Sequence, residues 1–263
     1  MIGRWWRNRK RRRILAQPFP SDWLKWLRER VPHYANLSPE QCEQLQKLVL
    51  VFLEEKEWEG CQGLDVTEEM KVTISGQACL MLLGLKHNYF YNVRNILVFP
   101  QHYEAASASV DASGVVHEGP QNVLGHASYD GPVALSWRSS REGGLNAHDG
   151  RNVVLHEFAH KLDFMDGFAN GVPILRKRGN YRRWFEIMQR EYDQLVARSE
   201  RRRATLLDDY GATNPGEFFA VCVECFFEKP KLMSKRHSEL YSILRAYFGQ
   251  DPAERRAGEA ING

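Results

Sequence analysis

Apolar residues in the first third of the chain recur every three to four positions, which is the spacing of a helix packed against a core. One such stretch covers 22–30. A second begins where Ser38 can cap a helix, Pro39 takes the first helical position and Gln41 completes a capping box. Its stripe of leucine, valine and phenylalanine predicts a helix that ends near Gly60.

The pattern changes in the middle of the chain, where short apolar runs are separated by Gly, Ser, Asp and Pro. These runs predict strands at 96–99, around Val115, around Val123 and at 133–137. Together they predict a small, twisted sheet within 93–137. The last strand, 133–137, is a candidate edge for pairing with an extended peptide.

Helical spacing also follows Thr67, and it returns from Asn152 almost to the C-terminus. The predicted fold class is therefore α+β, mainly helical with a small twisted mixed sheet. We expect one domain over 21–249, a basic N-terminal arm at 1–20 and a frayed C-terminal tail at 250–263.

Charge is distributed unevenly along the chain. The net charge of the 263 residues is only +3, yet seven of the first thirteen residues are Arg or Lys, and two tryptophans stand among them. Such an arm suits nucleic acid or an anionic membrane surface, but we prefer the interpretation that it is a solvated extension with little fixed structure. Because no basic face is evident elsewhere, the sequence is not typical of a nucleic-acid-binding protein.

The number of cysteines and the hydropathy of the chain indicate the cellular compartment of the protein. The five cysteines are an odd number and do not resemble a disulfide framework. Cys222 and Cys225 form a C-x-x-C with no second pair in the chain, so we interpret them as core thiols rather than zinc ligands. No apolar run is long enough to span a bilayer, and none follows the basic start as a secretory signal would. We therefore expect a cytoplasmic protein.

The segment beginning at Asn152 carries the most specific chemistry. His156 and His160 are four residues apart, so on a helix both imidazoles project from one face. That spacing lets two ring nitrogens reach one tetrahedral zinc ion, and Glu157 lies beside it as a base for a water molecule. The apolar residues around the motif predict a buried helix that holds the ligands rigidly. The sequence thus predicts one Zn²⁺ per chain.

A catalytic zinc site needs a third protein ligand, and two candidates are evident. Asp166 follows His160 by six residues, but the sharp turn that this arrangement requires has Asp163 where a glycine is usual. Glu217 lies in the first turn of a second apolar helix, which Asn214 caps and Pro215 opens.

Two further carboxylates are candidates for hydrogen bonds to the ligands. Asp163 lies one turn beyond His160 and is spaced to accept a hydrogen bond from the second ring nitrogen of a histidine ligand. A carboxylate on a solvated helix face explains the presence of Asp163 equally well. Glu224, seven residues after Glu217, is on a similar helix face and could orient a ligand or compete for the metal.

The segments 156–163 and 214–220 resemble the motifs of the Mlc titration factor A family of bacterial zinc peptidases. The resemblance extends to 131–137, 171–173 and 224–230, and over the two main motifs the chain is also similar to the catalytic domain of anthrax lethal factor. It implies a zincin, gluzincin-like fold with Glu217 as the third zinc ligand. It also implies that Tyr210 stabilises the oxyanion. Val221 stands where some related peptidases place an acidic residue that orients a ligand.

Two functions follow as hypotheses. The first is hydrolysis of a peptide or small protein, which the resemblance suggests is aminopeptidase activity. The second is regulatory, because the family name refers to titration of a transcriptional repressor of sugar uptake. In that case the chain binds and sequesters the repressor, with peptidase activity secondary or absent.

Overall fold

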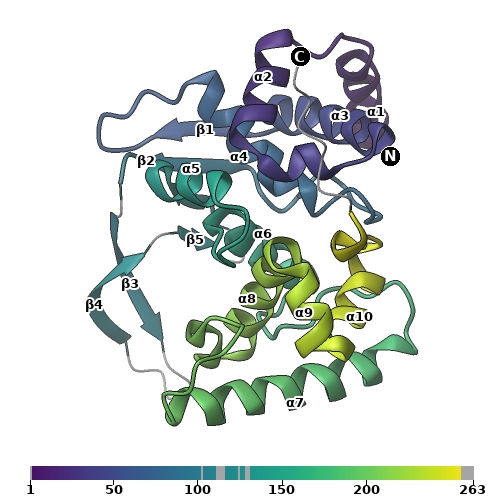
Figure 1. Ribbon diagram of the computed structural model, residues 1–263. Coiled ribbons are helices and arrows are strands. Elements are labelled where there is room, and N and C mark those ends of the chain that lie inside the picture. The colour runs from purple at the N-terminus through teal and green to yellow at the C-terminus, as the bar shows by residue number, and fades with distance from the viewer. Residues whose placement is uncertain (1, 102, 111–115, 124, 128–130, 256–263) are drawn as a thin grey trace.

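The molecule has helices at both ends of a small sheet (Figure 1). The computed structural model describes residues 2–101, 103–110, 116–123, 125–127 and 131–255. The helices within residues 2–80 gather at one end, and the long helix α7 (Asn180–Glu200) runs along the other (Figure 1). This arrangement agrees with the predicted α+β class, mainly helical with a small sheet.

The basic N-terminal segment is not a solvated extension with little fixed structure, because Ile2–Leu15 forms helix α1. Ile14 is buried against Leu50 and Val51. Arg11 forms a bidentate ion pair with Glu55, with N–O distances of 2.7 Å. These apolar and ionic contacts dock the arm onto helix α3.

Three helices follow, close to the predicted positions. They are α2 (Ser21–Arg30), α3 (Pro39–Glu55) and α4 (Glu68–Leu80), with the 3₁₀ turn η1 (Pro32–Asn36) after α2. The capping box at Ser38 and Gln41 is present in both directions. Helix α3 nevertheless stops at Glu55 rather than near Gly60, because the next residues form strand β1 (Glu57–Gly60).

The principal sheet has the strand order β1-β2-β6-β5. Strands β2 (Asn95–Phe99) and β6 (Val133–Ser136) pair in parallel, as do β1 and β2, whereas β5 (Gly125–Ala127) is antiparallel to β6. Because β6 has a partner on each side, the expectation that 133–137 offers a free edge is wrong. The edge strands of the described sheet are β1 and β5.

A separate antiparallel pair lies beside this sheet. It consists of β3 (Tyr103–Val110) and β4 (Val116–Val123), so the middle of the chain forms two sheets rather than one. The strand predicted around Val123 is confirmed, whereas Val115 lies outside the described residues. Trp137 begins a helix instead of ending a strand.

The C-terminal half is helical, as its spacing predicts. Its helices are α5 (Trp137–Leu145), α6 (Val153–Asp163), α7 (Asn180–Glu200), α8 (Pro215–Glu228), α9 (Pro230–Arg236) and α10 (Ser238–Phe248). Helix α8 is buried from Phe218 to its end and therefore runs through the core.

The first residues of the predicted tail are packed rather than frayed. Gln250 is buried and its amide donates to the carbonyl oxygen of Leu80 at 2.9 Å. A 3₁₀ turn, η4, follows at Pro252–Glu254. Residues 256–263 lie outside the described part of the chain.

Phe158 of α6 packs against the N-terminal half of the core. It is fully buried, with its ring centroid 5.7 Å from that of Phe52 and 4.8 Å from that of Phe90. We expect Phe158→Ala to lower the free energy of unfolding by about 3–5 kcal/mol, since a large cavity would remain. Urea unfolding measures this, with Phe185→Ala as the control because Phe185 is 60% exposed. Equal losses in both variants would contradict the assigned packing.

His33 in η1 predicts a pH-dependent stability. Burial lowers its pKa to about 4, and the cations of Arg255 and His148 add to this. Between that value and the unfolded pKa near 6.5, the unfolded chain binds the extra proton, so stability falls as the pH falls. We expect a loss of about 2 kcal/mol between pH 7.5 and pH 5. Comparison with His33→Gln in urea unfolding isolates this contribution, and an identical pH dependence in both proteins would refute it.

Candidate metal centre

Helix α6 presents His156 and His160 on one face. Its N-terminus is capped by Asn152, whose side-chain oxygen accepts from the backbone N–H of Leu155 at 3.0 Å. Apolar residues bury the opposite face, so the helix is held in the core. The two imidazoles lie with ring centroids 4.9 Å apart, as the spacing of four residues predicts.

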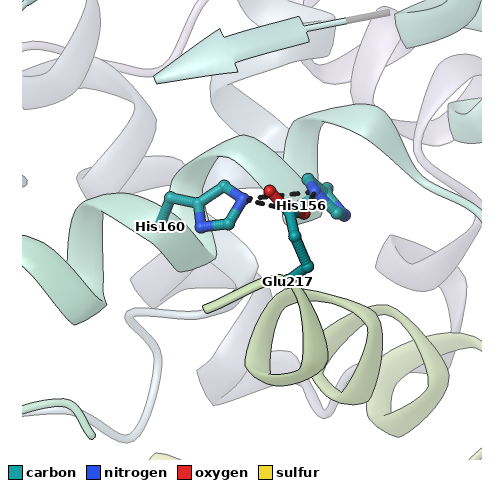
Figure 2. Close-up of side chains that lie close together, drawn as sticks. All are labelled: His156, His160 and Glu217. Carbon is teal, nitrogen blue, oxygen red and sulfur yellow. Dashed lines mark hydrogen bonds and ion pairs between the residues drawn. The ribbon is translucent and has the colours of Figure 1, made fainter. Parts of the chain in front are cut away.

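Helix α8 places a carboxylate beside the imidazoles of His156 and His160. Asn214 caps it by accepting from the N–H of Glu217 at 3.0 Å, and Pro215 occupies the first helical position, both as predicted. Glu217 therefore projects from the first turn of α8 toward α6, where it meets both histidines (Figure 2).

The three donor atoms form a compact triangle (Figure 2). The Nε2 atoms of His156 and His160 are 3.2 Å apart, and Glu217 Oε2 lies 2.9 Å and 3.4 Å from them, respectively. Around a tetrahedral Zn²⁺ with bonds of about 2.0–2.1 Å, donors are separated by about 3.3 Å. Two imidazoles and a carboxylate are also a donor set of catalytic zinc sites. Both the geometry and the chemistry therefore fit a zinc ion.

Glu224 links the histidine face of α6 to the core of α8. Its Oε2 lies 3.2 Å from His156 Nδ1, and its Oε1 accepts from the backbone N–H of Asn152 at 2.7 Å. A hydrogen bond to Nδ1 sets the tautomer that leaves Nε2 free to bind a metal. Of the two predicted alternatives for Glu224, the geometry thus favours orientation of a ligand over competition for the metal.

The charges of this centre are strongly coupled. Burial opposes ionisation of Glu217, but hydrogen bonds with His156 and His160 outweigh burial and lower its pKa to about 2. Burial also lowers the pKa of His156, but the charge of Glu224 and its other carboxylate contacts carry that pKa well above the ordinary value. Both shifts favour the charged forms of Glu217 and His156.

Glu157 lies beside the donors without joining them. It is only 4% exposed, and its Oε2 has no hydrogen-bond partner among the described residues. Burial raises its pKa to about 7 against the opposing effect of the two histidines. A carboxyl group with a pKa near neutrality is suited to exchanging protons.

Tyr210 reaches the centre from the 3₁₀ turn η3 (Asp209–Ala212), which precedes α8. Its ring centroid is 6.0 Å from that of His156, and the side chain remains 55% exposed. Partial burial, with the nearby charges of Glu217 and Glu157, raises its pKa to about 12. The phenol therefore stays protonated and is able to donate a hydrogen bond at the open side of the centre.

Asp163 contacts a loop rather than a ligand. Its Oδ2 accepts from the backbone N–H of Gly171 at 2.9 Å, and no hydrogen bond joins it to either histidine of the described centre. Gly171 has a φ of +73°, and a Cβ there would lie 2.4 Å from the carbonyl oxygen of Pro215. Asp163 thus holds the loop after α6 against the start of α8.

The alternative ligands are not in the cluster of donors. Asp166 accepts from the N–H of Phe168 in a local turn, and the group of donor atoms within 4.8 Å of one another contains only His156, His160 and Glu217 in the described chain. Cys222 and Cys225 are free and buried in α8, which agrees with their interpretation as core thiols.

Sequence reasoning missed the last member of the acidic face of α8. Glu228 follows Glu224 by one turn, and its Oε2 accepts from the N–H of Gly150 at 2.9 Å. Glu217, Glu224 and Glu228 are spaced by seven and four residues, which places them on one face of a helix. The spacing of these three glutamates in the sequence is the signal from which Glu228 could have been predicted to lie on this face.

The family of the chain follows from comparison with known proteins. The family described as glucose-regulated metallo-peptidase M90 matches residues 4–249. The chain belongs to this family. As a member of the M90 metallopeptidases, it is expected to use a metal ion, and His156, His160 and Glu217 form a candidate site for one.

Several relatives of this M90 member cover most of its length. "Uncharacterized protein slr2042" of Synechocystis sp. (strain ATCC 27184 / PCC 6803 / Kazusa) is 38% identical over 94% of this chain and 90% of its own. "Mlc titration factor A" of Cronobacter sakazakii is 32% identical over 84% of each chain. The protein of the same name from Edwardsiella ictaluri is 32% identical over 86% of each. The resemblance inferred from the motifs is thereby confirmed.

No helix among the described residues is both long and apolar enough to cross a membrane.

Proposed function

We propose that this M90 family member is a zinc-dependent peptidase with one Zn²⁺ held by His156, His160 and Glu217. The observation that carries the proposal is the convergence of these three donors from two capped helices. Glu217 is 61 residues from His156 and 57 residues from His160 in sequence, yet the three donor atoms lie within 4.8 Å of one another. The family membership of the chain supports the same reaction class.

The neighbouring side chains supply the remaining roles. Bound Zn²⁺ supplies Lewis acidity that polarises the scissile carbonyl and acidifies water. Glu157 accepts a proton from the water that attacks the carbonyl carbon, and it passes that proton to the amine as the C–N bond breaks. Tyr210 donates a hydrogen bond to the developing oxyanion. Its exposure at the centre supports access by a substrate.

Glu224 is a positioning residue in this proposal. We expect Glu224→Gln to weaken Zn²⁺ affinity by about 10–100-fold, since an amide orients His156 less strongly than a carboxylate does. Zinc competition with a chromophoric chelator measures this loss. The matched control is Glu191→Gln, which removes another buried carboxylate beside a histidine, 2.7 Å from His237 Nδ1. If Glu224→Gln bound Zn²⁺ with unchanged affinity, the proposal that Glu224 positions His156 would be wrong.

The function is tested on the wild-type chain by elemental analysis and hydrolysis of a peptide library. We expect about one zinc per chain, and hydrolysis that stops on chelation and returns with Zn²⁺. Release of single N-terminal residues would establish the aminopeptidase activity that the resemblance suggests, whereas internal cleavage would indicate an endopeptidase. A metal-free chain without hydrolysis would refute the proposal.

A second candidate function is regulation, as the name of the relatives called "Mlc titration factor A" suggests. In it the chain binds and sequesters a transcriptional repressor of sugar uptake in the cytoplasm. The five cysteines are free in the structure, which supports a reducing compartment. Co-purification of the repressor with both wild type and Glu157→Gln would support this role, because sequestration needs no hydrolysis. A complex that forms with neither protein would exclude it.

A further inference from the structure

A pocket lies at the opposite end of α8 from the candidate metal centre. It has a volume of about 290 Å³ and is formed by the end of α8, the start of α9, η1, η4 and the loop after α5. Glu217 and Glu228 are eleven residues apart, which corresponds to about 16 Å along the helix. The pocket is therefore separate from the proposed site of hydrolysis. Its volume is near the lower end of the range for small-molecule sites.

Three cations converge on this pocket without a carboxylate partner. Lys229, Lys231 and Arg255 all line it, and none forms an ion pair with a carboxylate in the described part of the chain. Lys229 extends over Gly150, where an added Cβ would lie 3.0 Å from its Nζ. Arg255 donates to the side-chain oxygen of Gln250 at 2.5 Å. Arg255 is half-buried, and burial lowers its pKa to about 10 although the nearby charge of Asp251 acts in the opposite direction.

A buried histidine adds a further unpaired polar atom. His33 lines the pocket and is 6% exposed, and its Nε2 has no hydrogen-bond partner among the described residues. Buried polar atoms are nearly always hydrogen-bonded, so one without a partner beside a cavity indicates a missing ligand or water.

The carboxyl group in the lining does not neutralise these cations. Glu228 already accepts the N–H of Gly150, and burial raises its pKa to about 9, so it is uncharged near neutral pH. The rest of the lining consists of the polar residues Asn36 and His148 and of an apolar set, Ala147, Phe227, Pro230, Leu232 and Pro252. The pocket thus combines a positive rim with a largely apolar lining.

We propose that this pocket binds a small organic anion, with a carboxylate or phosphate held by Lys229, Lys231 and Arg255 and a compact apolar body inside. Charge complementarity with the three cations is the observation that selects an anion over a neutral ligand, and the unpaired Nε2 of His33 offers one further polar contact. The binding does not depend on the proposed peptidase activity, because none of these residues belongs to the metal centre.

The proposal is tested by calorimetric titration of the full chain with phenyl phosphate, benzoate, inorganic phosphate and benzyl alcohol. We expect saturable binding of at least one aromatic anion and at least tenfold weaker binding of benzyl alcohol, which lacks the charge. A preference between phenyl phosphate and benzoate identifies the anionic group. Equal affinity for benzyl alcohol, equal affinity for inorganic phosphate, or no saturable binding of either aromatic anion would overturn the proposal.

Variants then locate the binding. We expect Lys229→Gln and Arg255→Gln each to weaken the aromatic anion at least tenfold, and the ligand to shift the NMR signals of the His33 ring. Lys231→Gln is the variant least able to disturb the fold because Lys231 is exposed. Lys235→Gln, an exposed cation on the same helix but outside the pocket, is the matched control. Unchanged affinity in all three pocket variants would place the binding elsewhere.

Discussion

Replacement of Glu157 by Gln is expected to lower the turnover of peptide hydrolysis by about 10²–10⁴-fold while the zinc content stays near that of the wild type. The amide keeps the shape of the side chain but cannot accept the proton of the attacking water. Glu157 is not one of the three donors, so its loss leaves the metal ligands intact. Initial-rate kinetics and elemental analysis on the same preparation measure both quantities.

The fold should survive this substitution. Glu157 is buried with one unpartnered oxygen, and burial raises its pKa to about 7, so a neutral amide is compatible with its surroundings. Glu142→Gln, an exposed carboxylate on α5, serves as the control and should retain full activity. Undiminished hydrolysis by Glu157→Gln would assign the base to another residue and reject the proposed mechanism.

Replacement of Glu217 by Ala is expected to weaken zinc affinity by more than about 100-fold, beyond the loss typical of a residue that only orients a ligand. Two histidines alone cannot complete the three-donor arrangement of a catalytic zinc site. Peptide hydrolysis should fall with the metal. The measurements are the zinc content after dialysis and the rate of hydrolysis in the presence of added Zn²⁺. Circular dichroism checks that the variant is folded, so that loss of a metal ligand is distinguished from unfolding.

Asp166→Ala is the informative control, because Asp166 is the rival third ligand by spacing alone. Among the described residues, the Asp166 side chain accepts a hydrogen bond only from the N–H of Phe168 in a local turn, so its replacement should leave zinc content and activity unchanged. If Glu217→Ala kept its zinc and Asp166→Ala lost it, the assigned centre would be wrong.

Local signals in the sequence were sufficient for the helices that carry the site. Asn152 and Asn214 cap α6 and α8, and Pro215 opens α8. Capping and helical spacing act within one or two turns, so they can be read without knowledge of distant residues. The pairing of His156 with His160 is predictable for the same reason.

Local signals were misleading where distant segments compete. The predicted helix that begins at Pro39 extends to near Gly60, yet 57–60 form β1 because β2, almost forty residues later, pairs with this segment. The interior position of β6 likewise depends on β2 and β5 on its two sides. Strand pairing is a non-local interaction, and helical spacing carries no information about it.

The sequence by itself therefore determined the helix that carries His156 and His160, the spacing of these histidines on one face and the family of the chain. Only the tertiary structure decided the third donor and the tasks of the other carboxylates. In the folded chain Glu217 contacts His156. Glu224 lies beside the ring of His156 and accepts from the backbone N–H of Asn152, whereas Asp163 accepts from the backbone N–H of Gly171. The physical reason is that ligand types and helical spacing are local properties, whereas a carboxylate's partner is set by how α6 and α8 pack.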